Sequence, residues 1–188
     1  MTNEELKVQL DRIRSRTAAL VSGLTPDQLT RRPSPSNWSI TECLAHLNLT
    51  AAVVQPKVAI AIEGARKNNL TGSGPFSPGA MGRLLFWIAE PPPKFRMRAP
   101  KKIVPSVAHG EPAQVVSDFR KVQDGWEKLI DDAEALDQNR IKLQSFPGLP
   151  RVRLSGAIPW MLAHQRRHLL QAEDVKRQIT QQASRAGA

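Results

Sequence analysis

Residues 37–47 read NWSITECLAHL, and residues 164–171 read HQRRHLLQ. In both stretches histidine stands within a pattern typical of an amphipathic helix. His164 and His168 are four residues apart, so on a helix both imidazoles project from one face, and that face should point into a core. A polar side chain at such a position costs free energy unless something pairs with it. A divalent metal best accounts for two inward imidazoles and a third from elsewhere in the chain.

Apolar residues recur with helical spacing in the N-terminal third of the chain, which predicts two long helices. The second of them should begin near Ile40, because Ser39 and Glu42 form a capping-box pattern before an apolar run. Pro56 lies inside this pattern and should kink the helix. The inward positions of the two helices are Leu6, Leu10, Ile13, Thr17, Leu20 and Leu24, then Leu44, Leu47, Ala51, Val54 and Val58.

Two more long helices are predicted in the C-terminal half. Pro112 should open one of them, Ser155 should cap the other, and the chain should fray after about Thr180. Their inward positions are Val115, Phe119, Val122, Trp126, Leu129 and Ala133, then Ala157, Met161, His164, His168, Ala172, Val175 and Ile179. Four amphipathic helices predict an all-α four-helix bundle, in one domain over residues 1–180 with a flexible tail at 181–188.

The segment between the second and third long helices, residues 68–112, is longer than a simple connection. Residues 64–79 are rich in Gly, Asn, Ser and Pro and predict a loop, whereas residues 80–90 predict a short helix. Because this insert carries the apolar group LLFWI, it should cover the bundle rather than hang free. We expect Phe86 or Trp87 to pack on the bundle or on a dimer partner.

Composition limits the classes of partner. The chain has 188 residues and a net charge of +10, and its densest basic group is Lys94, Arg96, Arg98, Lys101 and Lys102. A positive balance invites a nucleic-acid interpretation. However, the sequence has no helix-turn-helix signature, no zinc-finger spacing and no basic strand with interleaved aromatic residues. We therefore expect a solvated basic surface, with an anionic substrate or acidic partner as the alternative, and we do not expect nucleic acid as a partner.

Other features bear on compartment. The sequence has no run of about 18 apolar residues, so we expect no membrane-spanning helix and no membrane partner. The polar N-terminus does not resemble a signal peptide. Cys43 is the single cysteine, which excludes an internal disulfide and fits a cytoplasmic protein. It should be a buried, inert thiol rather than a ligand or nucleophile. His109 falls in a predicted loop without a partner at ligand spacing, so it should be solvated.

The three candidate metal ligands are His46, His164 and His168, and a second interpretation of them stays open. Neutral imidazole nitrogens bind zinc, nickel and related divalent ions well. Buried histidines bonded to a backbone carbonyl or a carboxylate are also common, so the spacing does not choose between the two. Three histidines around one ion would leave coordination positions open, which is the arrangement of catalytic rather than structural sites.

Residues beside these histidines have predicted roles of their own. Glu42 completes the capping box or acts as a carboxylate partner of the nearby histidine. Gln171 follows His168 by three residues and either orients an imidazole or a substrate, or lies on a partly solvated flank. Arg166 and Arg167 should point away from the core, toward solvent or a dimer partner.

Together these motifs resemble the DinB/YfiT-like superfamily. Its second helix starts with a loop that ends in proline and small residues, then Trp-Ser, Glu and His-Leu, which here are Pro35-Ser36-Asn37-Trp38-Ser39, Glu42 and His46-Leu47. Its last helix carries a His-x-x-x-His pair, often with Gln three residues on, which here are His164, His168 and Gln171.

The resemblance implies an up-down-down-up topology and a divalent metal bound by His46, His164 and His168. Members of the superfamily resemble metal-dependent thiol transferases, mycothiol-dependent isomerases and hydrolases, and they often look dimeric. This chain departs from the compact members through its insert at residues 68–112. The insert should shape access to the site.

Two hypotheses of function follow. The first is a metal-dependent enzyme of thiol transferase or hydrolase type, because an open metal ion lowers the pKa of a bound thiol or water. Its ion would be zinc or nickel, its substrate a small molecule such as a low-molecular-weight thiol, and its assembly a homodimer. The second is a non-enzymatic module that binds nucleic acid or an acidic partner through its basic surface. No separate general base stands out, so the reaction type stays open.

Overall fold

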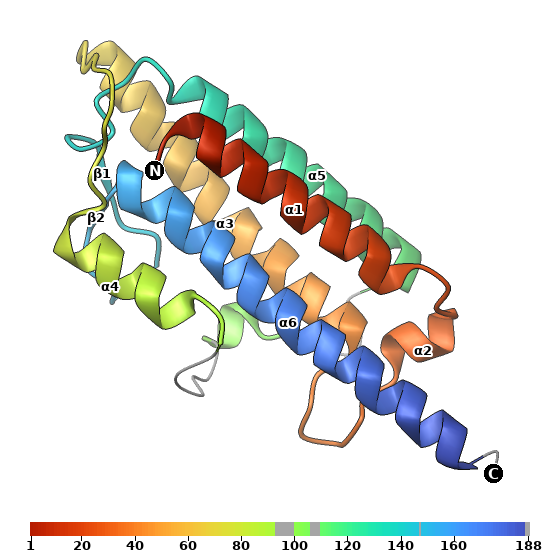
Figure 1. Ribbon diagram of the computed structural model, residues 1–188. Coiled ribbons are helices and arrows are strands. Elements are labelled where there is room, and N and C mark those ends of the chain that lie inside the picture. The colour runs from red at the N-terminus through yellow and green to blue at the C-terminus, as the bar shows by residue number, and fades with distance from the viewer. Residues whose placement is uncertain (93–99, 106–109, 147, 187–188) are drawn as a thin grey trace.

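The computed structural model describes residues 1–92, 100–105, 110–146 and 148–186. Four long helices dominate it: α1 (Asn3–Val21), α3 (Ile40–Lys67), α5 (Pro112–Asp132) and α6 (Leu154–Ala186). The smaller elements are α2 (Pro26–Thr30), α4 (Gly79–Ala89), the 3-10 turn η1 (Lys101–Ile103), β1 (Lys142–Leu143) and β2 (Val152–Arg153). The four long helices form the predicted bundle, and α4 lies on its outside (Figure 1).

The order of the helices is up-down-down-up, as the resemblance implies. Helices α3 and α5 run in one direction, and α1 and α6 run in the other (Figure 1). Hydrogen bonds between α3 and α5 advance along both helices together, since Asn48 donates to the Val115 carbonyl at 3.0 Å and Gln55 to the Val122 carbonyl at 2.8 Å. Parallel neighbours need a long connection, and the insert supplies it between the ends of α3 and α5.

The apolar faces predicted from periodicity form the core. The fully buried side chains include Leu10 and Ile13 of α1, Leu44 of α3, Trp126 of α5 and Ala172 of α6. Burial of an aliphatic side chain contributes about 1.5–3 kcal/mol, so this shared interior is the main source of stability.

The start of α3 is held by its predicted capping box. Ser39 Oγ accepts from the Glu42 amide at 3.1 Å, and Glu42 Oε2 accepts from the Ser39 amide at 2.9 Å. Arg32 adds a bidentate ion pair to the same carboxylate. Burial by itself would raise the pKa of Glu42, but the hydrogen bonds from Arg32 and Ser39 lower it. Glu42 therefore stays ionised and anchors the preceding loop to the helix.

Two predictions about the helices need correction. Ser155 does not cap α6, because the helix begins one residue earlier and the Ser155 hydroxyl donates to the Ser77 carbonyl at 2.8 Å. Helix α6 continues to Ala186, beyond the point near Thr180 where the pattern predicts fraying. Pro56 lies inside α3 as predicted, and the kink expected there stays a prediction. The short antiparallel β1–β2 pair was not predicted, since each strand has two residues.

Length and composition would allow α3 to cross a membrane, but half of its most apolar window is buried inside the bundle. A core helix has the same two properties, because it must be apolar on the faces that touch its neighbours. The expectation that the chain has no membrane-spanning helix therefore stays a prediction.

The insert packs on α6 through α4, as its apolar group predicts. Gly82 and Gly156 meet where the two helices approach each other, and a methyl group on Gly156 would lie 2.9 Å from the Gly82 Cα. The Cζ atom of the Arg166 guanidinium lies over the Phe86 ring, 5.9 Å from the ring centroid. The contact of Phe86 with Arg166 fulfils the expectation that Phe86 or Trp87 packs on the bundle, and Trp87 is half exposed.

The close approach of α4 and α6 makes a first prediction. Gly156→Ala places a methyl group 2.8 Å from the Pro78 carbonyl oxygen, so it should lower the free energy of unfolding by about 1–3 kcal/mol. Limited proteolysis should also cut the insert faster. Gly64→Ala is the matched control, because nothing lies within 4 Å of its added methyl group and alanine favours a helix by about 1 kcal/mol. Equal proteolysis of both variants would contradict the close packing.

Candidate metal centre

Three histidines meet where α3 faces α6. One potential ligand atom from each of His46, His164 and His168 lies within 4.8 Å of the others. The ring centroids are 4.5 Å apart for His46 and His168, and 4.6 Å apart for His164 and His168. His46 Nε2 lies 3.4 Å from His164 Nε2. The structure thus brings together all three candidate ligands, although 118 residues separate His46 from His164.

Local structure explains why these side chains meet. His46 lies within two turns of the capped start of α3, and its side chain is 2% exposed. His164 and His168 project from one face of α6, as their spacing requires, and both are partly exposed. Trp38 packs on the cluster, with its ring centroid 5.0 Å from that of His46 and 5.9 Å from that of His168.

Two acceptors hold the rings so that one nitrogen of each faces the cluster. His46 Nδ1 donates to the Ile103 carbonyl at 2.6 Å, and His168 Nδ1 donates to Gln171 Oε1 at 3.1 Å. Because both Nδ1 atoms carry the proton, the Nε2 atoms of these two rings carry bare lone pairs. Acceptors behind ligand histidines commonly fix the tautomer and the ring orientation in this way.

The cluster favours neutral imidazoles. Burial lowers the pKa of His46, and the hydrogen bond to Ile103 offsets part of that effect. Burial, together with repulsion from His46, lowers the pKa of His164 to about 3. Burial also lowers the pKa of His168 well below its ordinary value. All three rings are therefore uncharged near neutral pH, which is the form that binds a metal.

The donor set fits a divalent metal. Two neutral nitrogens with lone pairs at 3.4 Å repel each other unless a cation or proton lies between them. Imidazole nitrogens suit zinc, nickel, copper and iron. Three such donors leave at least one coordination position for water or substrate.

Sequence comparison agrees with this geometry. The family model of the DinB superfamily matches residues 9–172. This chain belongs to the DinB superfamily. YfiT from Bacillus subtilis, described as "a probable metal-dependent hydrolase with an unusual four-helix bundle topology", has a similar solved structure. The TM-score is 0.61 at 12% identity, over 95% of this chain and 87% of YfiT. No curated protein matches the chain.

In this DinB-superfamily protein, some neighbouring residues keep a predicted role and others do not. Glu42 completes the capping box, the first of its two predicted roles, and is not a partner of His46, because Arg32 and Ser39 occupy its carboxylate. Arg166 and Arg167 do not face open solvent. They bind the insert, through the Glu90 carboxylate and the Ile88 carbonyl respectively.

Other predictions are confirmed or lie outside the described residues. Gln171 orients His168, as one of its two predicted roles requires. Cys43 is fully buried, and burial raises the pKa of its thiol, so it is an inert core residue. His109, and the basic residues Lys94, Arg96 and Arg98, lie outside the described residues.

Sequence reasoning missed two contacts of the cluster. The Ile103 carbonyl belongs to the insert, and a backbone carbonyl has no side-chain signature that a sequence could reveal. The contact of Trp38 with the histidines had a partial signal, since this residue belongs to the motif that precedes α3.

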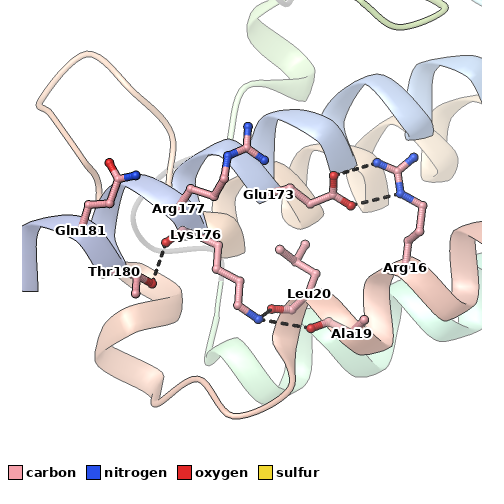
Figure 2. A pocket seen from close by; sticks show the side chains of 8 residues that line it. All are labelled: Arg16, Ala19, Leu20, Glu173, Lys176, Arg177, Thr180 and Gln181. Atoms are coloured by element: carbon pink, nitrogen blue, oxygen red, sulfur yellow. Dashed lines mark hydrogen bonds and ion pairs between the residues drawn. The ribbon is translucent and has the colours of Figure 1, made fainter. Parts of the chain in front are cut away.

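A hollow of about 580 Å³ between α1 and α6 does not include the histidines (Figure 2). Its charged residues are already used within the fold. Arg16 forms a bidentate pair with Glu173, and Lys176 donates to the carbonyls of Ala19 and Leu20 at the end of α1. We therefore assign this hollow a structural role and place the candidate site at the histidine cluster.

The contact between the insert and His46 makes a second prediction. Ile103 is buried, and Ile103→Ala should loosen the turn that presents its carbonyl, weakening metal binding about tenfold. Val104→Ala is the control, because Val104 is 42% exposed and next in the chain. Competition with a chromogenic chelator measures both affinities. Equal affinities would show that the turn does not orient His46.

The lowered histidine pKa values make a third prediction, for the metal-free protein. The unfolded chain binds protons near pH 6.5, the ordinary histidine value, whereas folded His164 binds one only near pH 3. The histidine contribution to stability is therefore complete above pH 6.5 and declines as pH falls toward 3. The free energy of unfolding, measured in urea across this pH range, should decline less steeply for His164→Gln than for the wild-type protein. Parallel profiles for the two proteins would contradict it.

Proposed function

We propose that this DinB-superfamily protein is a metal-dependent enzyme whose divalent ion is held by His46, His164 and His168. The observation that carries the proposal is the convergence of three imidazoles whose ligand atoms lie within 4.8 Å of one another. Zinc or nickel is the proposed ion, since both prefer imidazole donors.

The proposed reaction is hydrolysis or thiol transfer. When bound, a divalent ion supplies a Lewis acid that lowers the pKa of a water or thiol ligand. His46 and His168 present their Nε2 atoms because Ile103 and Gln171 hold their Nδ1 protons. The Trp38 ring packs on His46 and on His168 and limits the access of water to them. The description of YfiT as a hydrolase supports the first reaction type.

The proposal extends to partners and compartment. The substrate is a small molecule, with a low-molecular-weight thiol as the candidate for a transferase reaction. The protein acts in the cytoplasm, as its single cysteine suggests. A homodimer follows from the resemblance to the superfamily.

Metal content tests the proposal. His46→Ala, His164→Ala and His168→Ala should each lose most of the metal that the untagged protein retains, measured by elemental analysis. Gln178→Ala is the control, because it changes an exposed residue of α6, the helix that carries His164 and His168. Unchanged metal content in all three histidine variants would overturn the triad.

Removal of the metal distinguishes catalysis from structure. Chelation should lower the melting temperature only modestly and leave the helix content intact, because the aliphatic core is independent of the histidines. Any activity toward thiol or ester substrates should disappear and return with added metal. Complete unfolding on chelation would instead indicate a structural ion.

A further inference from the structure

The outer face of α4 is apolar although it points away from the bundle. The helix reads GAMGRLLFWIA, and Arg83 is its only charged residue. Gly82 and Ala89 are buried on the side that faces the bundle. Met81, Leu84 and Trp87 are 36%, 46% and 50% exposed. A surface helix ordinarily carries polar residues on its outer face, so an apolar outer face points to a further contact.

Positive charge borders this face. A hollow of about 400 Å³ at the start of α4 is lined by Met81 and by the cations Lys142, Arg151 and Arg153. In the part of the chain that the structure describes, none of the three cations forms an ion pair with an acidic residue. Arg153 lies against the beginning of α4, because a methyl group on Gly79 would be 3.3 Å from its Nε. The apolar face and the cations therefore form one continuous surface, which we name the α4 face.

We propose that the α4 face binds the surface of an anionic lipid bilayer. Exposed Trp and Leu side chains next to Lys and Arg are typical of helices that lie in the membrane interface. Cations beside a bilayer attract anionic headgroups, while the apolar residues enter the boundary with the acyl chains. The sequence predicted no membrane partner because it has no spanning segment, but a surface-bound helix requires none.

The charge pattern favours a bilayer over other occupants. In a dimer through this face, the unpaired cations of two copies, each with a net charge of +10, would approach one another. Nucleic acid would neutralise the cations but would leave the exposed parts of Met81 and Leu84 in contact with water. An anionic bilayer satisfies both parts of the surface.

Vesicle co-sedimentation tests the proposal on the full chain. Vesicles of phosphatidylcholine alone are compared with vesicles of equal parts phosphatidylcholine and phosphatidylglycerol. The wild-type protein should bind only the anionic vesicles. Leu84→Ser should weaken this binding at least about fivefold, and Arg151→Gln with Arg153→Gln should weaken it about fivefold for each cation removed.

The control is Ile60→Ser, which changes an exposed apolar residue of α3 outside the α4 face and should bind as the wild type does. Circular dichroism and metal content should be the same in all variants. Absence of binding to anionic vesicles would overturn the proposal. Equal binding of Leu84→Ser and Ile60→Ser to anionic vesicles would also overturn the proposal, since such binding would depend on net charge alone. Light scattering that shows Leu84→Ser dissociating a dimer would assign the face to a second copy instead.

Discussion

The candidate site is organised by one interaction, the approach of three uncharged imidazoles across the contact between α3 and α6. His46 and His164 bring Nε2 atoms to 3.4 Å, a separation at which two bare lone pairs are unfavourable unless a cation or a proton lies between them. Leucine at these positions would cost less free energy, because each inward imidazole loses packing that leucine would supply. Functional sites commonly break local rules of this kind. The aliphatic core around the cluster tolerates the loss.

The insert explains much of what surrounds the cluster. Its turn at Ile103 holds His46, and its helix α4 is held by Arg166 and Arg167, which lie between the two histidines of α6. The same segment therefore contacts both helices that carry ligands. A compact bundle without an insert would leave these arginines in solvent and His46 without this acceptor. The insert therefore contributes contacts to the candidate site as well as to the fold.

Helix α4 also shows how one short segment serves two surfaces. Its small residues, Gly82 and Ala89, allow close packing on the bundle, whereas Met81, Leu84 and Trp87 are exposed. An apolar outer face departs from the ordinary surface helix, in which polar residues face outward. The charge beside it comes from a different part of the chain, the β1–β2 hairpin, so the α4 face exists only in the folded molecule.

The sequence by itself determined the four helices, their buried faces, the capping box at Ser39 and the pairing of His164 with His168. These features are local, because helical spacing and caps act within a few residues. The pattern made His46 a candidate, and the resemblance to a family implied that it binds the metal together with this pair. Only the tertiary structure decided that the Ile103 carbonyl orients His46, that Arg166 binds Glu90, and that Ser155 bonds to Ser77 instead of capping α6. The partner of a long side chain or a backbone carbonyl depends on which distant segment covers it, and no local pattern encodes that.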